Sequence, residues 1–172
     1  MNQDGITERL GGIDWLSFQA DRIARGLIAM MMAVMIAVVL FGVFNRFLFK
    51  FPISWTEEIA KYLLVWISML GSSVAIRVGA HVGVGLLVTR LGKRSKNVVS
   101  WINQILIMIF IIGLGILGLK FSIEEMDQMG YVTRISMFWP FLAMPVGSLL
   151  MIVQLLHIMK LLHNRLSPPL GF

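Results

Sequence analysis

The sequence contains no cysteine and is poor in charged residues. The missing thiols exclude disulfides, thiolate metal sites and cysteine nucleophiles. Charged residues make up 14% of the 172 residues, whereas soluble domains carry about a quarter. Hydrophobic residues make up 58%. So little polar surface predicts an integral membrane protein.

Acidic residues are also scarce, nine against 15 lysines and arginines, which gives a net charge of +6. The basic residues form short clusters between apolar runs, which is typical of membrane topology rather than of a nucleic-acid-binding patch. No nucleophile, base and oxyanion donor come together, and no set of metal ligands is visible. We therefore expect no nucleic-acid partner, no enzymatic activity and no cofactor.

Four apolar runs each approach the length of about 20 residues that crosses the hydrocarbon core. The sequence predicts an all-α integral membrane protein with one four-helix membrane domain over residues 27–162. The four transmembrane helices are expected at about residues 27–49, 55–77, 97–120 and 137–160.

Short interfacial amphipathic helices are expected beside these spans. Residues 13–25 (IDWLSFQADRIAR) mix aromatic and aliphatic side chains with aspartates and arginines, a pattern that suits a helix lying in the membrane interface. Residues 82–91 are short, apolar and basic in the same way. Residues 1–26 are thus predicted to be an N-terminal region with an interfacial helix, and residues 163–172 a tail.

The lysines and arginines predict the orientation of the chain. Residues 1–26, 77–96 and 160–172 hold ten of the 15, and the connections on the opposite side hold five. Because positively charged connections stay in the cytoplasm, both termini are expected to be cytoplasmic in a bacterial inner membrane.

The second span begins with Glu57 and Glu58, and Lys61 follows within helical pairing distance of both. A proton or cation site is one interpretation of these carboxylates. The other is an ion-paired helix start at the membrane edge that packs against another helix. The second is favoured, because the charges cluster at one end and not near the bilayer middle.

Small and polar residues predict helix contacts. The second span carries a stripe at 3.5-residue spacing, and small residues of this kind let membrane helices approach closely. Its members are Ser54, Glu58, Lys61, Val65, Ser68, Ser72, Ala75 and Gly79. Packing is also expected at Ala29, Ala33 and Ala37, at Gly113, Gly115 and Gly118, at Gln154 and His157, and a bend at Pro145.

The connection between the third and fourth spans contains Glu124, Glu125 and Asp127. A solvated loop is the simpler interpretation of these three charges. Electrostatic docking of a soluble partner is the alternative.

Several motifs of the chain resemble the small membrane subunit (DctQ-like) of tripartite ATP-independent periplasmic (TRAP) transporters. They are Asn45-Arg46-Phe47, Trp55-Thr56-Glu57-Glu58, Trp66, Gly71, Ala75-Ile76-Arg77, residues 79–84 (GAHVGV) and Met144-Pro145-Val146-Gly147-Ser148.

The resemblance implies partners and a role. In such systems a periplasmic binding protein delivers an organic acid anion, such as a C4-dicarboxylate or sialic acid, to the membrane complex. A large membrane subunit holds the substrate and the coupling sodium, and the small subunit enlarges its rigid scaffold. Because the chain ends after the fourth span, a separate large subunit is expected.

The resemblance makes the charged ends of the second span structural or partner-facing. The expected interface and anchor residues are Trp55, Glu57, Glu58, Lys61, Ser68, Ser72, Arg77 and His81. An autonomous small four-helix transporter or channel, with Glu57 or Glu58 as its coupling carboxylate, stays open as the alternative, as does a scaffold unrelated to transport.

Overall fold

The computed structural model describes residues 12–50, 53–78 and 93–163, and its regular secondary structure is helical. The helices are α2 (Gly12–Leu48), α3 (Ser54–Arg77), α5 (Lys93–Glu124), α6 (Phe138–Phe141) and α7 (Ala143–His163). Helices α2, α3 and α5 each contain a stretch that is long and apolar enough to cross a membrane, and α6 and α7 together form a fourth such span, Phe138–Lys160. The predicted all-α membrane fold with four spanning helices is confirmed.

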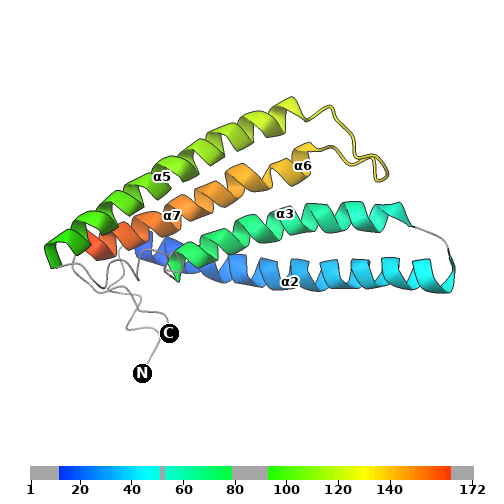
Figure 1. The fold of residues 1–172 in the computed structure, drawn as a ribbon, viewed down its shortest axis with the longest axis horizontal. Helices are drawn as coiled ribbons and strands as arrows, with labels where there is room; N and C mark the ends of the chain where they lie inside the picture. The colour runs from blue at the N-terminus through cyan, green and yellow to red at the C-terminus, as the bar shows by residue number, and fades with distance from the viewer. Residues whose placement is uncertain (1–11, 51–52, 79–92, 164–172) are drawn as a thin grey trace, which may run out of the picture.

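The long helices lie side by side in the order α5, α7, α3, α2 (Figure 1). Helices α5 and α7 run antiparallel, as do α3 and α2, whereas α7 and α3 run parallel. Helix α2 also contacts α7. The starts of α2 and α5 and the ends of α3 and α7 therefore share one end of the molecule, called here the terminal end. The opposite end, called the hairpin end, holds the end of α2, the start of α3 and residues 125–137.

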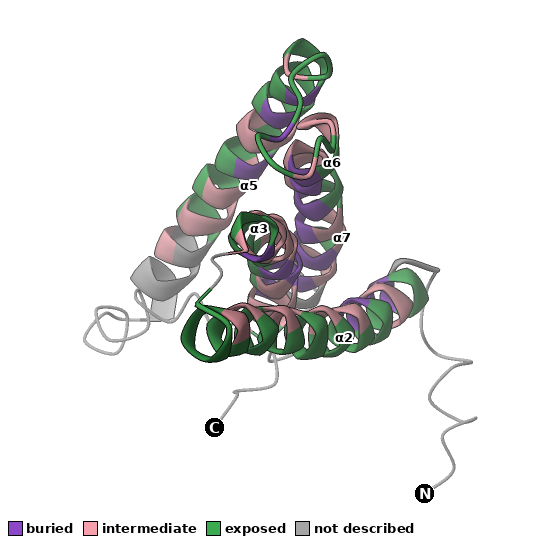
Figure 2. Ribbon diagram, turned by 90° about the vertical axis from the view of Figure 1, so that its right-hand side faces the viewer, coloured by how far each residue is buried: buried purple, intermediate pink, exposed green. Residues whose placement is uncertain are grey.

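The interior lies around α7 and α3 (Figure 2). A cluster of buried aliphatic side chains joins α3, α5 and α7. Its members are Ile76, Ile111, Met151, Leu155 and Ile158. The most apolar stretch of α2 has no buried residue, whereas 39% of the most apolar stretch in the span of α6 and α7 is buried. The outer helices thus leave a wide apolar surface for lipid or for another protein.

Two of the three glycines predicted to be packing notches on α5 lie against α7. A Cβ atom at Gly115 would lie 2.6 Å from Ser148 Oγ, and one at Gly118 would lie 2.5 Å from Met144 Cβ. A Cβ atom at Gly113 would meet open space. The packing prediction is therefore confirmed for Gly115 and Gly118 and wrong for Gly113. It is also wrong for Ala29, Ala33 and Ala37 within this chain, because all three are exposed.

The glycine contacts predict opposite effects of the same substitution. Gly118→Ala should lower the stability of the fold by about 1–3 kcal/mol, because the added methyl group would meet the Cβ atom of Met144, which cannot move without a shift of the backbone. Gly113→Ala should leave stability unchanged or raise it by up to about 1 kcal/mol through helix propensity. Thermal unfolding in detergent measures the stability of both variants. Equal effects of the two substitutions would contradict the close packing of Gly118 against α7.

The segment expected to be a separate interfacial helix forms the first turns of α2. Asp14, Ser17 and Asp21 are buried, and Trp15 and Phe18 are exposed, so the polar face of this segment turns toward protein. No proline interrupts residues 13–48, and the helix continues into the apolar run. The other expected interfacial segment, residues 82–91, lies outside the described residues, and the expected tail does so beyond His163.

The fourth span is interrupted at Leu142, between α6 and α7. Pro145 has no N–H to donate to the carbonyl four residues earlier, at Phe141, and its ring crowds that carbonyl. The predicted bend therefore lies one turn before Pro145. Trp66 Nε1 of α3 donates to the carbonyl of Trp139 in α6 at 3.2 Å, which fixes the short helix beside α3.

Candidate partner-facing surface and the polar contacts that hold it

Glu58 joins the start of α3 to the loop between α5 and α6. Its Oε2 accepts hydrogen bonds from the backbone N–H groups of Val132 and Thr133, both at 3.0 Å. Its Oε1 accepts one from the hydroxyl of Tyr62, one helical turn further on, at 2.5 Å. A single carboxylate thus holds residues that are more than 70 positions apart in the sequence.

The loop is shaped to admit this carboxylate. A Cβ atom at Gly130 would overlap Glu58 Oε1, so glycine is required by close approach. Gly130 N donates to Ile135 O at 2.8 Å, and Met137 N donates to Gln128 O at 2.9 Å, which closes the loop as a short hairpin. We call the contacts of Glu58 with Tyr62, Val132 and Thr133 the Glu58 clamp.

The other charged residues of this end stay outside the clamp. Glu57 and Lys61 are exposed, and Glu58 bonds to the loop and Tyr62 instead of to Lys61, the partner that helical spacing predicts. Trp55 is 36% exposed, and its ring centroid lies 6.0 Å from that of Phe41 on α2.

Ser68 and Ser72 lie on an exposed face of α3. Both hydroxyls donate to the carbonyl one turn earlier, to Leu64 O at 2.7 Å and to Ser68 O at 2.8 Å. With Lys61 they form an exposed stripe of small and polar residues along the membrane-spanning part of the helix. Their backbone bonds leave the stripe free of unpaired hydroxyl donors, so it can meet lipid or another helix.

The terminal end holds a second set of polar contacts, which we call the Asp14 network. Asp14 on α2 is 9% exposed, and its carboxylate contacts two side chains of α7. His157 Nδ1 lies 2.7 Å from Asp14 Oδ1, and Lys160 Nζ donates to Asp14 Oδ2 at 2.6 Å. These contacts tie the first turn of α2 to the last turns of α7.

Ser17 extends the network by one turn. Its hydroxyl donates to Gln154 Oε1 at 2.5 Å, and its carbonyl accepts from Gln154 Nε2 at 3.0 Å and from Arg77 at 2.5 Å. Arg77 Nε also lies 3.9 Å from Asp21 Oδ2. The predicted contact of Gln154 and His157 with another helix is confirmed, and that helix is α2.

Sequence reasoning missed the α2 half of this network. Asp14, Ser17 and Asp21 are spaced by three and four residues, so they share one helical face. The amphipathic pattern alone predicts that this polar face meets water at the membrane interface. The polar face of α7, with Gln154, His157 and the neighbouring Lys160, was the signal that this face had a protein partner.

The remaining predicted residues lie at the two ends or outside the described chain. Arg77 lies at the terminal end, and Glu124, Glu125 and Asp127 lie at the hairpin end. Among the residues that the structure describes, Glu124 pairs with Lys120 on its own helix, at 3.6 Å, and both side chains are largely exposed. His81 lies outside the described residues. Within the described residues, no three His, Asp or Glu side chains are placed to hold a metal ion.

Comparison with known proteins identifies a family that this sequence matches. Residues 20–163 match the family described as "Tripartite ATP-independent periplasmic transporters, DctQ component". The sialic acid TRAP transporter small permease protein SiaQ of Vibrio cholerae is 25% identical over 136 residues, which are 77% of this chain and 79% of that protein. The C4-dicarboxylate TRAP transporter small permease protein DctQ of Rhodobacter capsulatus is 26% identical over 106 residues, 60% of this chain and 47% of that protein.

A third relative is much longer than this chain. The sialic acid TRAP transporter permease protein SiaT of Haemophilus influenzae is 32% identical over 115 residues, which are 65% of this chain and only 18% of SiaT. The family consists of transporter components and not of enzymes. Because the family match covers most of the sequence, including all four spanning helices, the chain belongs to the DctQ family of TRAP transporter components.

Proposed function

We propose that this chain is the small, accessory membrane subunit of a sodium-coupled TRAP transporter that imports an organic acid anion. It stabilises and anchors a large membrane subunit, which holds the substrate and the sodium. The relatives are named for sialic acid and C4-dicarboxylate, and these two acids define the expected substrate class.

One observation carries this proposal. Sequence like that of this chain makes up most of a small permease protein, SiaQ, and also a minor part of a long permease protein, SiaT. A unit that occurs both alone and within a larger permease is expected to pack against the rest of that permease. A large membrane subunit is therefore the partner that this chain requires.

The part of the exposed stripe of α3 that holds Ser68 and Ser72 is the surface that we assign to this partner. Helix α2 offers apolar side chains to its surroundings, which is what lipid accepts, whereas α3 exposes the hydroxyl side chains of Ser68 and Ser72. Small residues let a second helix approach closely, and in a bilayer that close packing drives association.

Co-purification tests this assignment. Replacing Ser68 and Ser72 together by tryptophan should reduce the amount of large subunit that a tagged copy of this chain retains by about tenfold, because two bulky rings block the close approach. Ala33→Trp is the matched control, because Ala33 is exposed on α2. The half-buried Met31 and Met35, each two residues away, lie on the opposite side of α2, so the side chain at position 33 points away from the rest of this chain. Equal retention in both variants would refute the assignment.

The chain is a multi-pass protein of the bacterial inner membrane. We infer that the terminal end faces the cytoplasm, because most lysines and arginines flank the spans there. The hairpin end then faces the periplasm. Its exposed carboxylates, Glu124 and Asp127 with the partly buried Glu125, are the candidate docking site for a periplasmic substrate-binding protein.

An autonomous transporter that couples through Glu57 or Glu58 is not favoured. The carboxylate of Glu58 already accepts three hydrogen bonds from this chain, which suits a structural anchor. Glu57 lies in the first turn of α3, far from the middle of the span where a coupling carboxylate is expected.

A further inference from the structure

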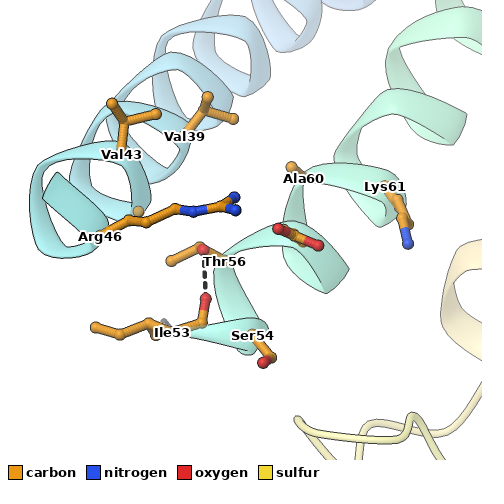
Figure 3. A pocket seen from close by; sticks show the side chains of 10 residues that line it. Val39, Val43, Arg46, Ile53, Ser54, Thr56, Ala60 and Lys61 are labelled. Carbon is orange, nitrogen blue, oxygen red and sulfur yellow. Dashed lines mark hydrogen bonds between the residues drawn. The ribbon is translucent and has the colours of Figure 1, made fainter. Parts of the chain in front are cut away.

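A pocket of about 430 Å³ lies between the hairpin-end halves of α2 and α3, outside both the Glu58 clamp and the Asp14 network. Apolar and charged side chains share its wall. The apolar ones are Val39, Val43 and Ala60, and the charged ones are Arg46, Glu57 and Lys61. Figure 3 shows Arg46 reaching from α2 toward α3, with Lys61 on the α3 side.

The pocket wall is fixed by the contact between the two helices. Thr56 is buried, and its hydroxyl donates to the carbonyl of Ile53 at 2.8 Å, as the dashed line in Figure 3 marks. A Cβ atom at Gly42 would lie 2.6 Å from the same hydroxyl oxygen, so α2 and α3 approach closely here. The site is therefore formed before any ligand enters.

The three charges are not paired with one another. Arg46, Glu57 and Lys61 take part in none of the ion pairs formed among the described residues. All three are exposed and lie near the hairpin-end limits of the candidate membrane spans of α2 and α3, where charged side chains reach the lipid headgroups. A ligand at the membrane boundary with complementary groups would pair with them.

We propose that this pocket binds a phospholipid whose headgroup carries both a phosphate and a primary ammonium, as phosphatidylethanolamine does. The phosphate accepts charge-assisted hydrogen bonds from Arg46 and Lys61. The ammonium donates to Glu57, which a headgroup without an N–H⁺ donor would leave unpaired. The acyl chains continue along the apolar surface of α2 at Val39 and Val43.

A lipid fits this wall better than a protein segment does. The charges stand beside apolar side chains on two membrane-spanning helices, which matches the polar-to-apolar order of a phospholipid along the bilayer normal. The wall offers two cationic side chains, Arg46 and Lys61, and one carboxylate, Glu57, which complement the phosphate and the ammonium of a zwitterionic headgroup. The proposal gives Glu57 and Lys61 an anchoring role that does not depend on the identity of the transported acid.

Lipid binding to the full chain tests the proposal. The chain is purified in detergent, stripped of lipid and titrated with phosphatidylethanolamine, phosphatidylcholine or phosphatidylglycerol of identical acyl chains, and bound lipid is counted by native mass spectrometry. Phosphatidylethanolamine should bind with a stoichiometry of one and about tenfold tighter than the other two. Glu57→Gln should remove this preference, and Arg46→Gln should weaken all three about tenfold.

Arg134→Gln is the matched control, because Arg134 is an exposed arginine at the same end that does not line the pocket, and it should leave lipid binding unchanged. Equal affinity of the parent chain for the three lipids, or unchanged binding in Arg46→Gln, would show annular lipid only and overturn the proposal. The complex with the large subunit is titrated in the same way. Loss of the bound lipid there would make the pocket a protein interface and would also overturn it.

Discussion

Trypsin should cleave the chain after Arg134 at least about tenfold faster when Glu58 is replaced by alanine. Arg134 is exposed, but its backbone is held in a tight turn with φ of 56°, and its N–H donates to Gly130 O at 3.2 Å. A protease needs several residues in extended form, so cleavage requires the loop to open. The Glu58 clamp opposes that opening.

The size of the effect follows from what alanine removes. The two N–H groups of Val132 and Thr133 lose their acceptor, and the hydroxyl of Tyr62 loses a partner on its own helix. When opening is faster than cleavage, the cleavage rate is proportional to the population of the open loop. A substitution that destabilises the closed loop therefore raises the cleavage rate in proportion to the population of the open loop.

Two further variants make this result specific. Glu58→Gln keeps the shape and one acceptor oxygen, so it should accelerate cleavage less than alanine does. Glu124→Gln removes an exposed carboxylate at the same end of the molecule and should leave the rate unchanged. The fragment that begins at Ile135 identifies the cut by mass spectrometry. Similar rates in Glu58→Ala and Glu124→Gln would mean that the clamp does not hold the loop.

The spanning helices could be predicted because their signal is local. About 20 consecutive apolar residues have few alternatives to a membrane helix, since every backbone polar group must be paired within the segment. The close packing at Gly115 and Gly118 could also be predicted, because it follows from the small size of glycine. Which helix packs there could not be predicted from the sequence.

The Glu58 clamp could not be predicted, because its partners are distant in sequence. Helical spacing offered Lys61 as the nearest opposite charge, but a lysine at the membrane boundary keeps its hydration when it stays exposed. Two adjacent backbone N–H groups of the turn offer Glu58 charge-assisted hydrogen bonds in a fixed geometry, so its carboxylate bonds to the turn instead of to Lys61. Tyr62, one turn after Glu58, was the only local part of the site.

The Asp14 network could not be predicted from the sequence for a different reason. The amphipathic pattern of residues 13–25 was identified correctly, but which face met water was inferred from polarity alone. In a membrane protein the apolar face can meet lipid, and the polar face can meet protein, since buried polar groups pair with one another there. Trp15 and Phe18 are accordingly exposed, and Asp14 and Ser17 are buried.

The second large effect is expected at Asp14. Asp14→Ala should lower the stability of the fold by about 2–3 kcal/mol, because it leaves His157 and Lys160 without their acceptor at a buried helix contact. The value is below that of a fully buried ion pair, since the side chain of Lys160 is 36% exposed and recovers some hydration. The transition in thermal unfolding should fall by roughly 4–12 °C. Asp127→Ala, at an exposed carboxylate of the loop, should shift it little.

A double variant separates the ion pair from a general loss of packing. Lys160→Met keeps the aliphatic stem that lies along α7 and removes the charge. If the pair is the stabilising contact, Lys160→Met in the Asp14→Ala background should cost less than it does alone, because the lysine has already lost its partner. Additive losses would show that Asp14 and Lys160 act independently. Coupling would establish that the start of α2 is held to α7 by charge, although most of the following apolar run of α2 is exposed.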